Sequence, residues 1–150
     1  MIGPVYFPHR LTAPDYLTFL QNELQNLLDD LPLNRIANIT FQQDGCPVHS
    51  SRVVTNFLNN KYGGNWIGRH GPIKWPPRSP DLTPLDFYVW GRAKEIVYDE
   101  EIVSIDHLKQ KIELAFAKIR EEISLNVTTS EIHSRYSKCI DAEGSHFENL

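Results

Sequence analysis

Two aspartates, Asp44 and Asp86, stand at positions where a carboxylate could do chemistry. Asp44 directly follows residues 36–42, a segment whose β-branched and aromatic residues predict a buried strand. Asp86 is the third residue of a predicted helix that begins at Thr83, with Pro84 in its first position. Ligands of open α/β sheets gather at the carboxyl ends of strands, and a helix N-terminus favours an anion. Two convergent carboxylates would hold a hard divalent cation such as Mg²⁺, and a pair of such ions can support phosphoryl transfer.

The spacing of the two aspartates is compatible with such a site. The 41 residues between them are enough for a helix, a short strand and a loop that returns the second carboxylate beside the first. Each aspartate also has a purely structural interpretation. Asp86 completes a helix cap, and Asp44 is a turn residue before Gly45. The residues alone leave both interpretations open.

The elements that would position these carboxylates follow an α/β order. A helix is predicted from the Thr12 cap to Pro32, with Asp15 in its capping box. A second helix is predicted over 50–60, and its inner side is expected to carry Val53, Val54, Phe57 and Leu58. Ser104 is the predicted cap of an amphipathic helix. The expected order is a strand at 2–7, the helix from 12, the strand at 36–42, the helix at 50–60, a short strand and turn within 65–75, and helices from 83, over 104–123 and over 129–140. This is an α/β domain with a helical tail.

Composition sets only loose limits on function. The chain has 150 residues and a net charge of −4, and it contains no apolar run near the roughly 20 residues that a membrane span needs. The charge is unevenly distributed: residues 61–94 carry +4, whereas residues 95–150 carry −6. The basic segment fits either a nucleic-acid contact or an ordinary solvated surface.

Three segments together resemble the C-terminal part of a mariner-like DDE transposase. They are FQQDGCPVHSSRVVTNFL at 41–58, WIGRHGPIKWPPRSPDLTPLDFYVWG at 66–91 and CIDAEGSHFENL at 139–150. The resemblance covers nearly the whole chain, with the three segments in order.

The resemblance implies an RNase H-like fold in which three carboxylates bind two Mg²⁺ or Mn²⁺ ions, cut transposon ends and join them to target DNA in the nucleus. Asp44 matches the second of these carboxylates and Asp86 the third, although the 41-residue gap is longer than in typical mariner enzymes. It further implies a catalytic domain over residues 1–98 with a helical tail over 99–150.

DNA is the partner that the resemblance implies. The expected nucleic-acid contacts lie on the segment that leads to Asp86, namely Arg69, His70, Lys74 and Arg78. Trp66, Trp75 and Trp90 could stack on bases, but a core position is the expected one for Trp90.

The chain also departs from the family pattern. The first family carboxylate lies on a strand upstream of the segment that aligns with Met1, so we expect a partial fold that lacks the first two strands. We therefore expect no strand-cleaving activity from the 150 residues alone. Residues 36–42 would then expose an unpaired edge. The alternatives are a nucleic-acid-binding module that uses residues 61–94, or a protein that pairs through that edge with a second copy or with a full-length transposase.

Overall fold

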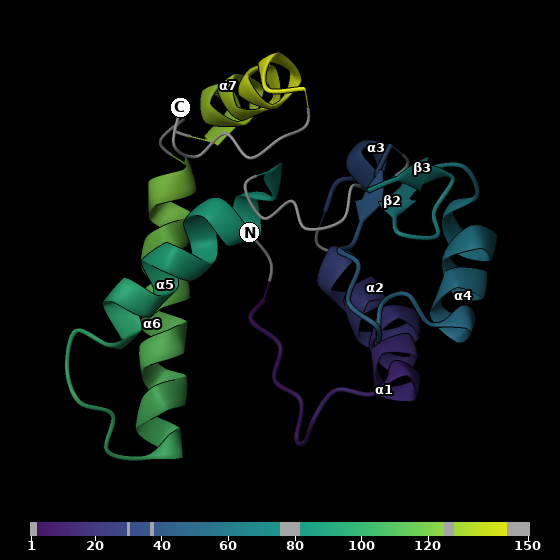
Figure 1. Ribbon diagram of the computed structural model, residues 1–150. Coiled ribbons are helices and arrows are strands. Elements are labelled where there is room, and N and C mark those ends of the chain that lie inside the picture. Colours follow the sequence, from purple (N-terminus) through teal and green to yellow (C-terminus); the bar gives the residue numbers. More distant parts are fainter. Residues whose placement is uncertain (1–2, 30, 37, 76–81, 125–127, 144–150) are drawn as a thin grey trace. The chain divides into compact units, whose positions relative to one another are not determined.

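The computed structural model describes residues 3–29, 31–36, 38–75, 82–124 and 128–143 (Figure 1). Apart from the first three residues, the chain divides into two compact units, Pro4–Arg78 and Ser79–Leu150. We refer to them as the N-terminal unit and the C-terminal unit and describe each by itself. Within the described residues, no helix has both the length and the apolar character that a membrane span requires.

The N-terminal unit opens with a helix that runs through α1 (Ala13–Thr18), a π-helical stretch η1 (Phe19–Glu23) and α2 (Leu24–Leu28). The predicted capping box is present, because the Thr12 hydroxyl accepts from the Asp15 N–H and the Asp15 carboxylate accepts from the Thr12 N–H. The hydrogen bond from Thr12 holds the pKa of the Asp15 carboxyl below its usual value. The strand predicted at 2–7 is wrong over residues 3–7, which are irregular. Pro4 lacks the N–H that a ladder would need.

Three short parallel strands form the sheet of this unit, in the order β1 (Phe41–Gln42), β2 (Trp66–Gly68) and β3 (Ile73–Lys74). The helix α4 (Arg52–Tyr62) connects β1 to β2. Phe41 pairs with Trp66, and Gly68 pairs with Lys74. The predicted α/β class is confirmed, with a small parallel sheet.

The strand predicted over 36–42 is reduced to its last two residues. A short helix, α3 (Leu33–Ile36), takes the start of the segment. Local hydrogen bonds hold it there: the Ile39 N–H donates to the Ile36 carbonyl at 3.3 Å, and the Asn38 side chain donates to the Asn34 carbonyl at 2.8 Å. Asn side chains that bond to nearby carbonyls compete in this way with a strand ladder.

Trp66 is the centre of the N-terminal core. It is fully buried, as are Val54 and Leu58, which lie one turn apart on α4, and Tyr16 and Leu20 complete the cluster. The predicted inner position of Val53 is wrong: its side chain is 48% exposed, because it lies about 100° around the helix from Val54.

Gly68 is required by the packing of Trp66. A Cβ on Gly68 would lie 2.8 Å from Cζ3 of the Trp66 ring, closer than two carbon atoms can approach. The indole Nε1–H of Trp66 donates to Asn59 Oδ1 at 3.0 Å, so the buried ring is also satisfied at its polar edge.

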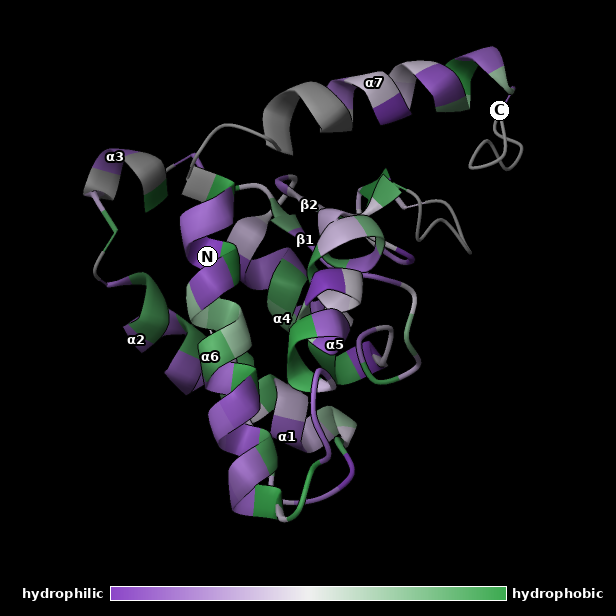
Figure 2. Cartoon of the chain, turned by 90° about the vertical axis from the view of Figure 1, so that its left-hand side faces the viewer, coloured by the Kyte–Doolittle hydropathy of each residue, from purple (hydrophilic) through white to green (hydrophobic). Residues whose placement is uncertain are grey.

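The regular elements in the described part of the C-terminal unit are helices. A helix begins after Thr83 and runs through η3 (Leu85–Val89) into α5 (Trp90–Val97), followed by α6 (Ile105–Ser124) and α7 (Thr128–Asp141). Apolar residues recur between polar ones along α6 (Figure 2). The predicted Ser104 cap is confirmed, since the Ser104 hydroxyl accepts from the His107 N–H at 3.0 Å. The predicted core position of Trp90 is wrong: it is 45% exposed and contacts Phe116 with one side of its ring.

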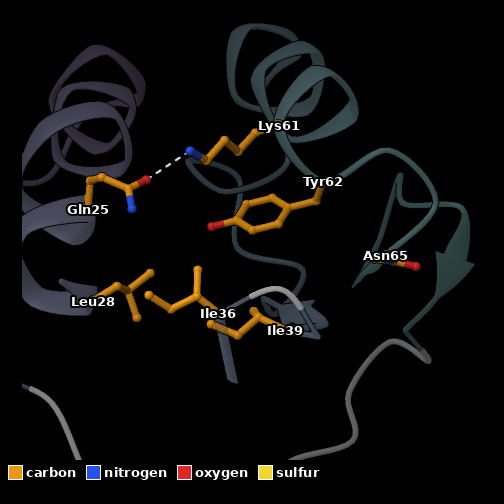
Figure 3. A pocket seen from close by; sticks show the side chains of 7 residues that line it. All are labelled: Gln25, Leu28, Ile36, Ile39, Lys61, Tyr62 and Asn65. Atoms are coloured by element: carbon orange, nitrogen blue, oxygen red, sulfur yellow. Dashed lines mark hydrogen bonds between the residues drawn. The ribbon is translucent and has the colours of Figure 1, made fainter. Parts of the chain in front are cut away.

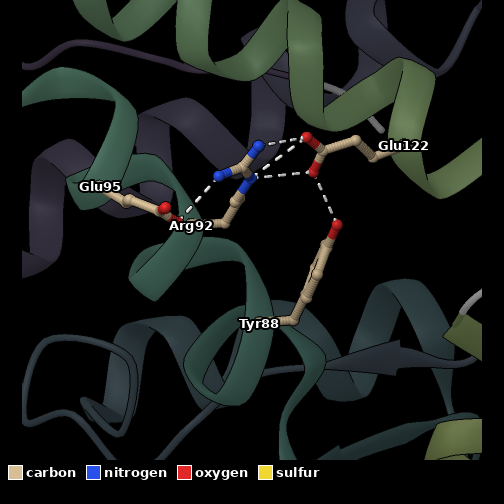
Figure 4. A network of polar contacts seen from close by, with 4 residues as sticks. All are labelled: Tyr88, Arg92, Glu95 and Glu122. Carbon is tan, nitrogen blue, oxygen red and sulfur yellow. Dashed lines mark hydrogen bonds and ion pairs between the residues drawn. The ribbon is translucent and has the colours of Figure 1, made fainter. Parts of the chain in front are cut away.

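A polar network ties α5 to α6 beside their apolar contact (Figure 4). Arg92 forms an ion pair with Glu122 at 2.8 Å, and the Tyr88 hydroxyl donates to the same carboxylate at 2.8 Å. Glu95 pairs with the remaining guanidinium nitrogen, Nη1, at 2.8 Å. Arg92, and to a lesser extent Tyr88, hold the pKa of the Glu122 carboxyl below its usual value.

Candidate metal centre

The carboxyl ends of the three parallel strands lie at one edge of the sheet, and this edge carries the predicted site residues of the N-terminal unit. The Gln43 N–H still donates to the Ile67 carbonyl at 3.0 Å, so the ladder continues to the residue before Asp44. Arg69 directly follows β2, and Lys74 ends β3. Asp44 therefore stands at the edge where open α/β sheets bind ligands.

The Asp44 carboxylate is held on one oxygen. Oδ1 accepts from the Cys46 N–H at 3.1 Å and lies 2.5 Å from Nδ1 of His49. A turn closed by the Ser50 N–H and the Cys46 carbonyl at 2.9 Å brings His49 back to Asp44. Within the described part of the chain, no hydrogen bond is found on Oδ2. The Asp44 side chain is 57% exposed, so this oxygen is open to a ligand.

The residues behind Asp44 form a buried polar support. The Gln43 side chain, in a residue only 7% exposed, donates from Nε2 to the His49 carbonyl at 2.8 Å. The Tyr16 hydroxyl donates to Gln43 Oε1 at 3.3 Å, and the Tyr16 ring lies 4.4 Å from the His49 ring. Burial, together with the nearby Asp44 charge, raises the pKa of Tyr16, so its hydroxyl remains a donor.

Basic side chains flank the same edge. A Cβ added to Gly45 would meet Cδ of Arg69 at 3.9 Å, so the Arg69 side chain lies over the turn that follows Asp44. Arg69, His70 and Lys74 are all exposed. Arg78, the fourth predicted nucleic-acid contact, lies outside the described residues.

Asp86 belongs to the C-terminal unit. It is exposed in the first turn of its helix, where its N–H donates to the Thr83 carbonyl at 2.8 Å. The predicted helix start is thus present, with the Thr83 backbone carbonyl as its first acceptor. Because Asp44 and Asp86 lie in separate units, their convergence stays a prediction. Within the residues that the structure describes, no three His, Cys, Asp or Glu side chains gather as a metal site.

A pocket near the amino ends of β1 and β2, the opposite end of the strands from Asp44, is lined by the side chains that Figure 3 labels. Its volume is about 190 Å³, and its lining includes Asn65, which precedes β2, and Ile39, which precedes β1. Lys61 reaches across it to donate to Gln25 at 2.8 Å. This pocket is therefore separate from the edge that carries Asp44 and Arg69.

The sequence indicates that Asp44 follows a strand, but it does not indicate which residues lie behind Asp44 and support it. His49, Gln43 and Tyr16 form this support, and Tyr16 is 28 positions before Asp44. The only local signal for His49 is the turn-forming Cys46-Pro47 pair, which can return the chain toward Asp44. No spacing rule points to Tyr16.

The chain is similar to two curated proteins and to several solved structures. No protein-family model matches the sequence. The chain is 26% identical over 138 residues to the transposable element Tc3 transposase of Caenorhabditis elegans, a match that covers 91% of this chain and 38% of that protein. It is 32% identical over 76 residues to the human histone-lysine N-methyltransferase SETMAR, covering 49% of this chain and 10% of that protein. The chain thus spans well under half the length of these two relatives.

Solved structures of the Mos1 mariner transposase catalytic domain share the fold. One with raltegravir and Mn has a TM-score of 0.70 at 22% identity, covering 94% of this chain and 68% of that one. A further crystal structure of the same domain has a TM-score of 0.69 at 22% identity, covering 94% of this chain and 66% of that one. Another Mos1 structure contains raltegravir with Mg. The resemblance to mariner-like transposases that the sequence indicates is confirmed.

Proposed function

We propose that these 150 residues are part of the catalytic domain of a mariner-like DNA transposase, with Asp44 and Asp86 as two of its metal-binding carboxylates. The observation that carries this proposal is the placement of Asp44. The carboxylate stands at the carboxyl edge of the sheet, held on Oδ1 and open on Oδ2, in a chain whose fold matches the Mos1 catalytic domain. We propose an RNase H-like fold of which residues 1–98 form an incomplete part and residues 99–150 a helical tail.

The donor chemistry of the site fits Mg²⁺ or Mn²⁺. Both ions prefer carboxylate oxygens, and the exposed Oδ2 of Asp44 offers such a donor without competing hydrogen bonds in the described part of the chain. When bound, such ions supply an activated attacking oxygen and stabilise the leaving oxygen of phosphoryl transfer. In this proposal, Asp44 and Asp86 bind the ions. Arg69, His70, Lys74 and Arg78 hold the phosphates of the DNA.

We further propose that the 150 residues alone do not cut DNA. In the family that the chain resembles, a third carboxylate that would help to hold the ions lies upstream of the segment aligned with Met1. Two carboxylates hold a pair of divalent ions weakly, so neither the attacking nor the leaving oxygen is stabilised.

A nicking assay tests this proposal. Purified residues 1–150 are incubated with supercoiled plasmid and Mg²⁺ or Mn²⁺, beside Asp44→Ala as the matched control. We expect equal, background-level nicking from both. Nicking by the unaltered chain that Asp44→Ala abolishes would contradict the proposed inactivity while supporting Asp44 as a metal ligand.

A second candidate function is nucleic-acid binding without catalysis. It is favoured by Arg69, which lies over the Asp44 turn, and by the exposed His70 and Lys74 on the same edge. If Arg69 and Lys74 each neutralise one phosphate, these two contacts alone weaken binding by about tenfold between 50 and 200 mM salt.

The control for this binding test lies in the same unit. Lys61 has the same charge but lies at the opposite end of the sheet. We expect the double variant Arg69→Ala/Lys74→Ala to weaken duplex binding and flatten its salt dependence, whereas Lys61→Ala leaves both unchanged. Equal losses of DNA affinity from the two variants would exclude DNA binding at the end of the sheet that carries Asp44.

The proposed location and partners follow from the proposed substrate. A protein that acts on chromosomal DNA works in the nucleus. The strand β1 pairs with β2 on one side, and among the described residues no strand lies on its other side. We therefore propose that a further strand adds there, from a second copy of the chain or from a full-length transposase. Co-purification of the chain with a tagged full-length relative tests this pairing.

A further inference from the structure

We propose that His49 is a positioning residue for Asp44: its Nδ1–H holds Oδ1, so that Oδ2 faces the divalent ion. This inference rests on the proposed function, because it assigns a role to His49 only through the metal-binding role of Asp44. His49 and Asp44 are 2.5 Å apart at these two atoms. Carboxylates that bind metals are themselves usually held by hydrogen bonds from a second layer of residues.

The burial of the two side chains supports this division of roles. The His49 side chain is 22% exposed and the Asp44 side chain 57%. His49 thus contacts the carboxylate from the side of the protein, and the side of the Asp44 carboxylate that faces solvent is left free for a ligand. The Cys46 N–H reinforces the arrangement, because it donates to the same oxygen, Oδ1, at 3.1 Å.

His49 is itself fixed at two points. Its backbone carbonyl accepts from the buried Gln43 side chain at 2.8 Å, and its ring lies 4.4 Å from that of Tyr16 at an interplanar angle of 36°. The Tyr16 hydroxyl closes the set by donating to Gln43 at 3.3 Å. A side chain held at both backbone and ring can orient a neighbour, because it has little rotational freedom left to lose.

The contact also determines which ring nitrogen carries the proton. An ionised carboxylate only accepts hydrogen bonds, so Nδ1 of His49 must be the donor. Asn can reproduce this donor, because its amide nitrogen is as many bonds from Cα as Nδ1 is. The amide nitrogen of Gln instead corresponds to Nε2. His49→Asn and His49→Gln therefore form a matched pair that separates a hydrogen bond through Nδ1 from metal ligation through Nε2.

The test uses NMR of the full 150-residue chain, because Mn²⁺ broadens nearby amide signals even when it binds weakly. The signals of Gly45 and Cys46 report binding at Asp44, and Asp44→Ala gives the background. We expect the Gly45 and Cys46 signals of His49→Asn to broaden at Mn²⁺ concentrations similar to those that broaden them in the unaltered chain. We expect His49→Gln and His49→Ala to need about tenfold more Mn²⁺, the usual loss when such a supporting hydrogen bond is removed. A second measurement, the ¹⁵N spectrum of the His49 ring in the unaltered chain, should find the proton on Nδ1.

The outcomes separate the inference from the proposed function. If Asp44→Ala abolishes the broadening but His49→Gln behaves like the unaltered chain, His49 does not position Asp44 and the metal site stands. If His49→Asn loses binding as fully as His49→Gln, His49 acts by another route and the inference is wrong. If Asp44→Ala leaves the broadening unchanged, Mn²⁺ does not bind at Asp44. The inference that Oδ2 faces the divalent ion then fails as well. A His49 ring without a proton on Nδ1 would overturn the inference even if every variant failed to fold.

Discussion

The neighbouring valines of α4 allow a sharp test of the N-terminal core. Val53 and Val54 have the same side chain and the same helical backbone, but Val53 is 48% exposed and Val54 is 0% exposed. Replacing either by Ala brings the same gain in helix propensity, about 0.5 kcal/mol. The difference between the two variants therefore isolates the effect of burial.

The magnitude follows from the atoms removed. Val54→Ala removes two buried carbon groups worth about 0.8 kcal/mol each. It also leaves a cavity beside Trp66, which brings the gross loss to about 2–3 kcal/mol. After the propensity gain, we expect the free energy of unfolding to fall by about 2 kcal/mol. Val53→Ala should stay within about 0.5 kcal/mol of the unaltered chain.

Urea unfolding followed through the Trp66 indole N–H signal is the appropriate assay. That proton is hydrogen-bonded to Asn59 inside the same unit, so its signal reports the N-terminal unit and not the helices of the C-terminal unit. Equal losses from the two valine variants, or a larger loss from Val53→Ala, would refute the assigned orientation of α4.

Two further predictions concern the buried tryptophan and the polar network between α5 and α6. Gly68→Ala should lower the melting temperature of the N-terminal unit, because the added Cβ would lie 2.8 Å from the Trp66 ring, whereas Gly64→Ala, which meets nothing within 4 Å, should change it little. The pKa of Glu122 is lowered mainly by Arg92, so its contribution to stability is present above the pKa of the unfolded chain, about 4.3, and is lost as the pH falls through the lower folded value. The melting temperatures of the unaltered chain and Glu122→Gln should therefore differ at pH 7, and the difference should shrink as the pH falls below the pKa of the unfolded chain; a difference that grows on acidification would contradict this ion pair.

Much of the helical structure could be predicted because its determinants are local. The Thr12–Asp15 capping box and the Ser104 cap are short sequence patterns whose hydrogen bonds form within one turn, and both are present. The strands depend on partners elsewhere in the chain. The apolar residues of 36–40 satisfy a strand pattern, but the side-chain hydrogen bond from Asn38 to the Asn34 carbonyl favours a helical turn there. Val53 and Trp90 were misplaced for a related reason, since periodicity locates an apolar face only to within about one residue.

The residues of the candidate site also differ in whether their placement depends on local sequence or on tertiary packing. Asp44 was predictable because a carboxylate after a buried strand is a local feature. Its contact with His49 depends on the turn at 46–50, and its support by Tyr16 depends on packing between α1 and the sheet edge. Neither is encoded in a spacing that can be read from the chain. The convergence of Asp44 with Asp86 depends on how the two units meet, and it remains a prediction that the valine and glycine variants do not address.

The shortness of the strands has a consequence for how the Asp44 edge forms during folding. Strands of two and three residues supply few ladder hydrogen bonds, so the sheet cannot hold itself together before α1 and α4 pack on Trp66. Pairing β2 with β3 closes a short loop, whereas pairing β1 with β2 must bring together residues separated by the whole of α4. Pairing of β1 should therefore be a late step of folding, and Gln43, the residue before Asp44, reaches its place in the ladder only then. A partner that pairs with β1 would therefore act on the placement of the Asp44 carboxylate without touching it.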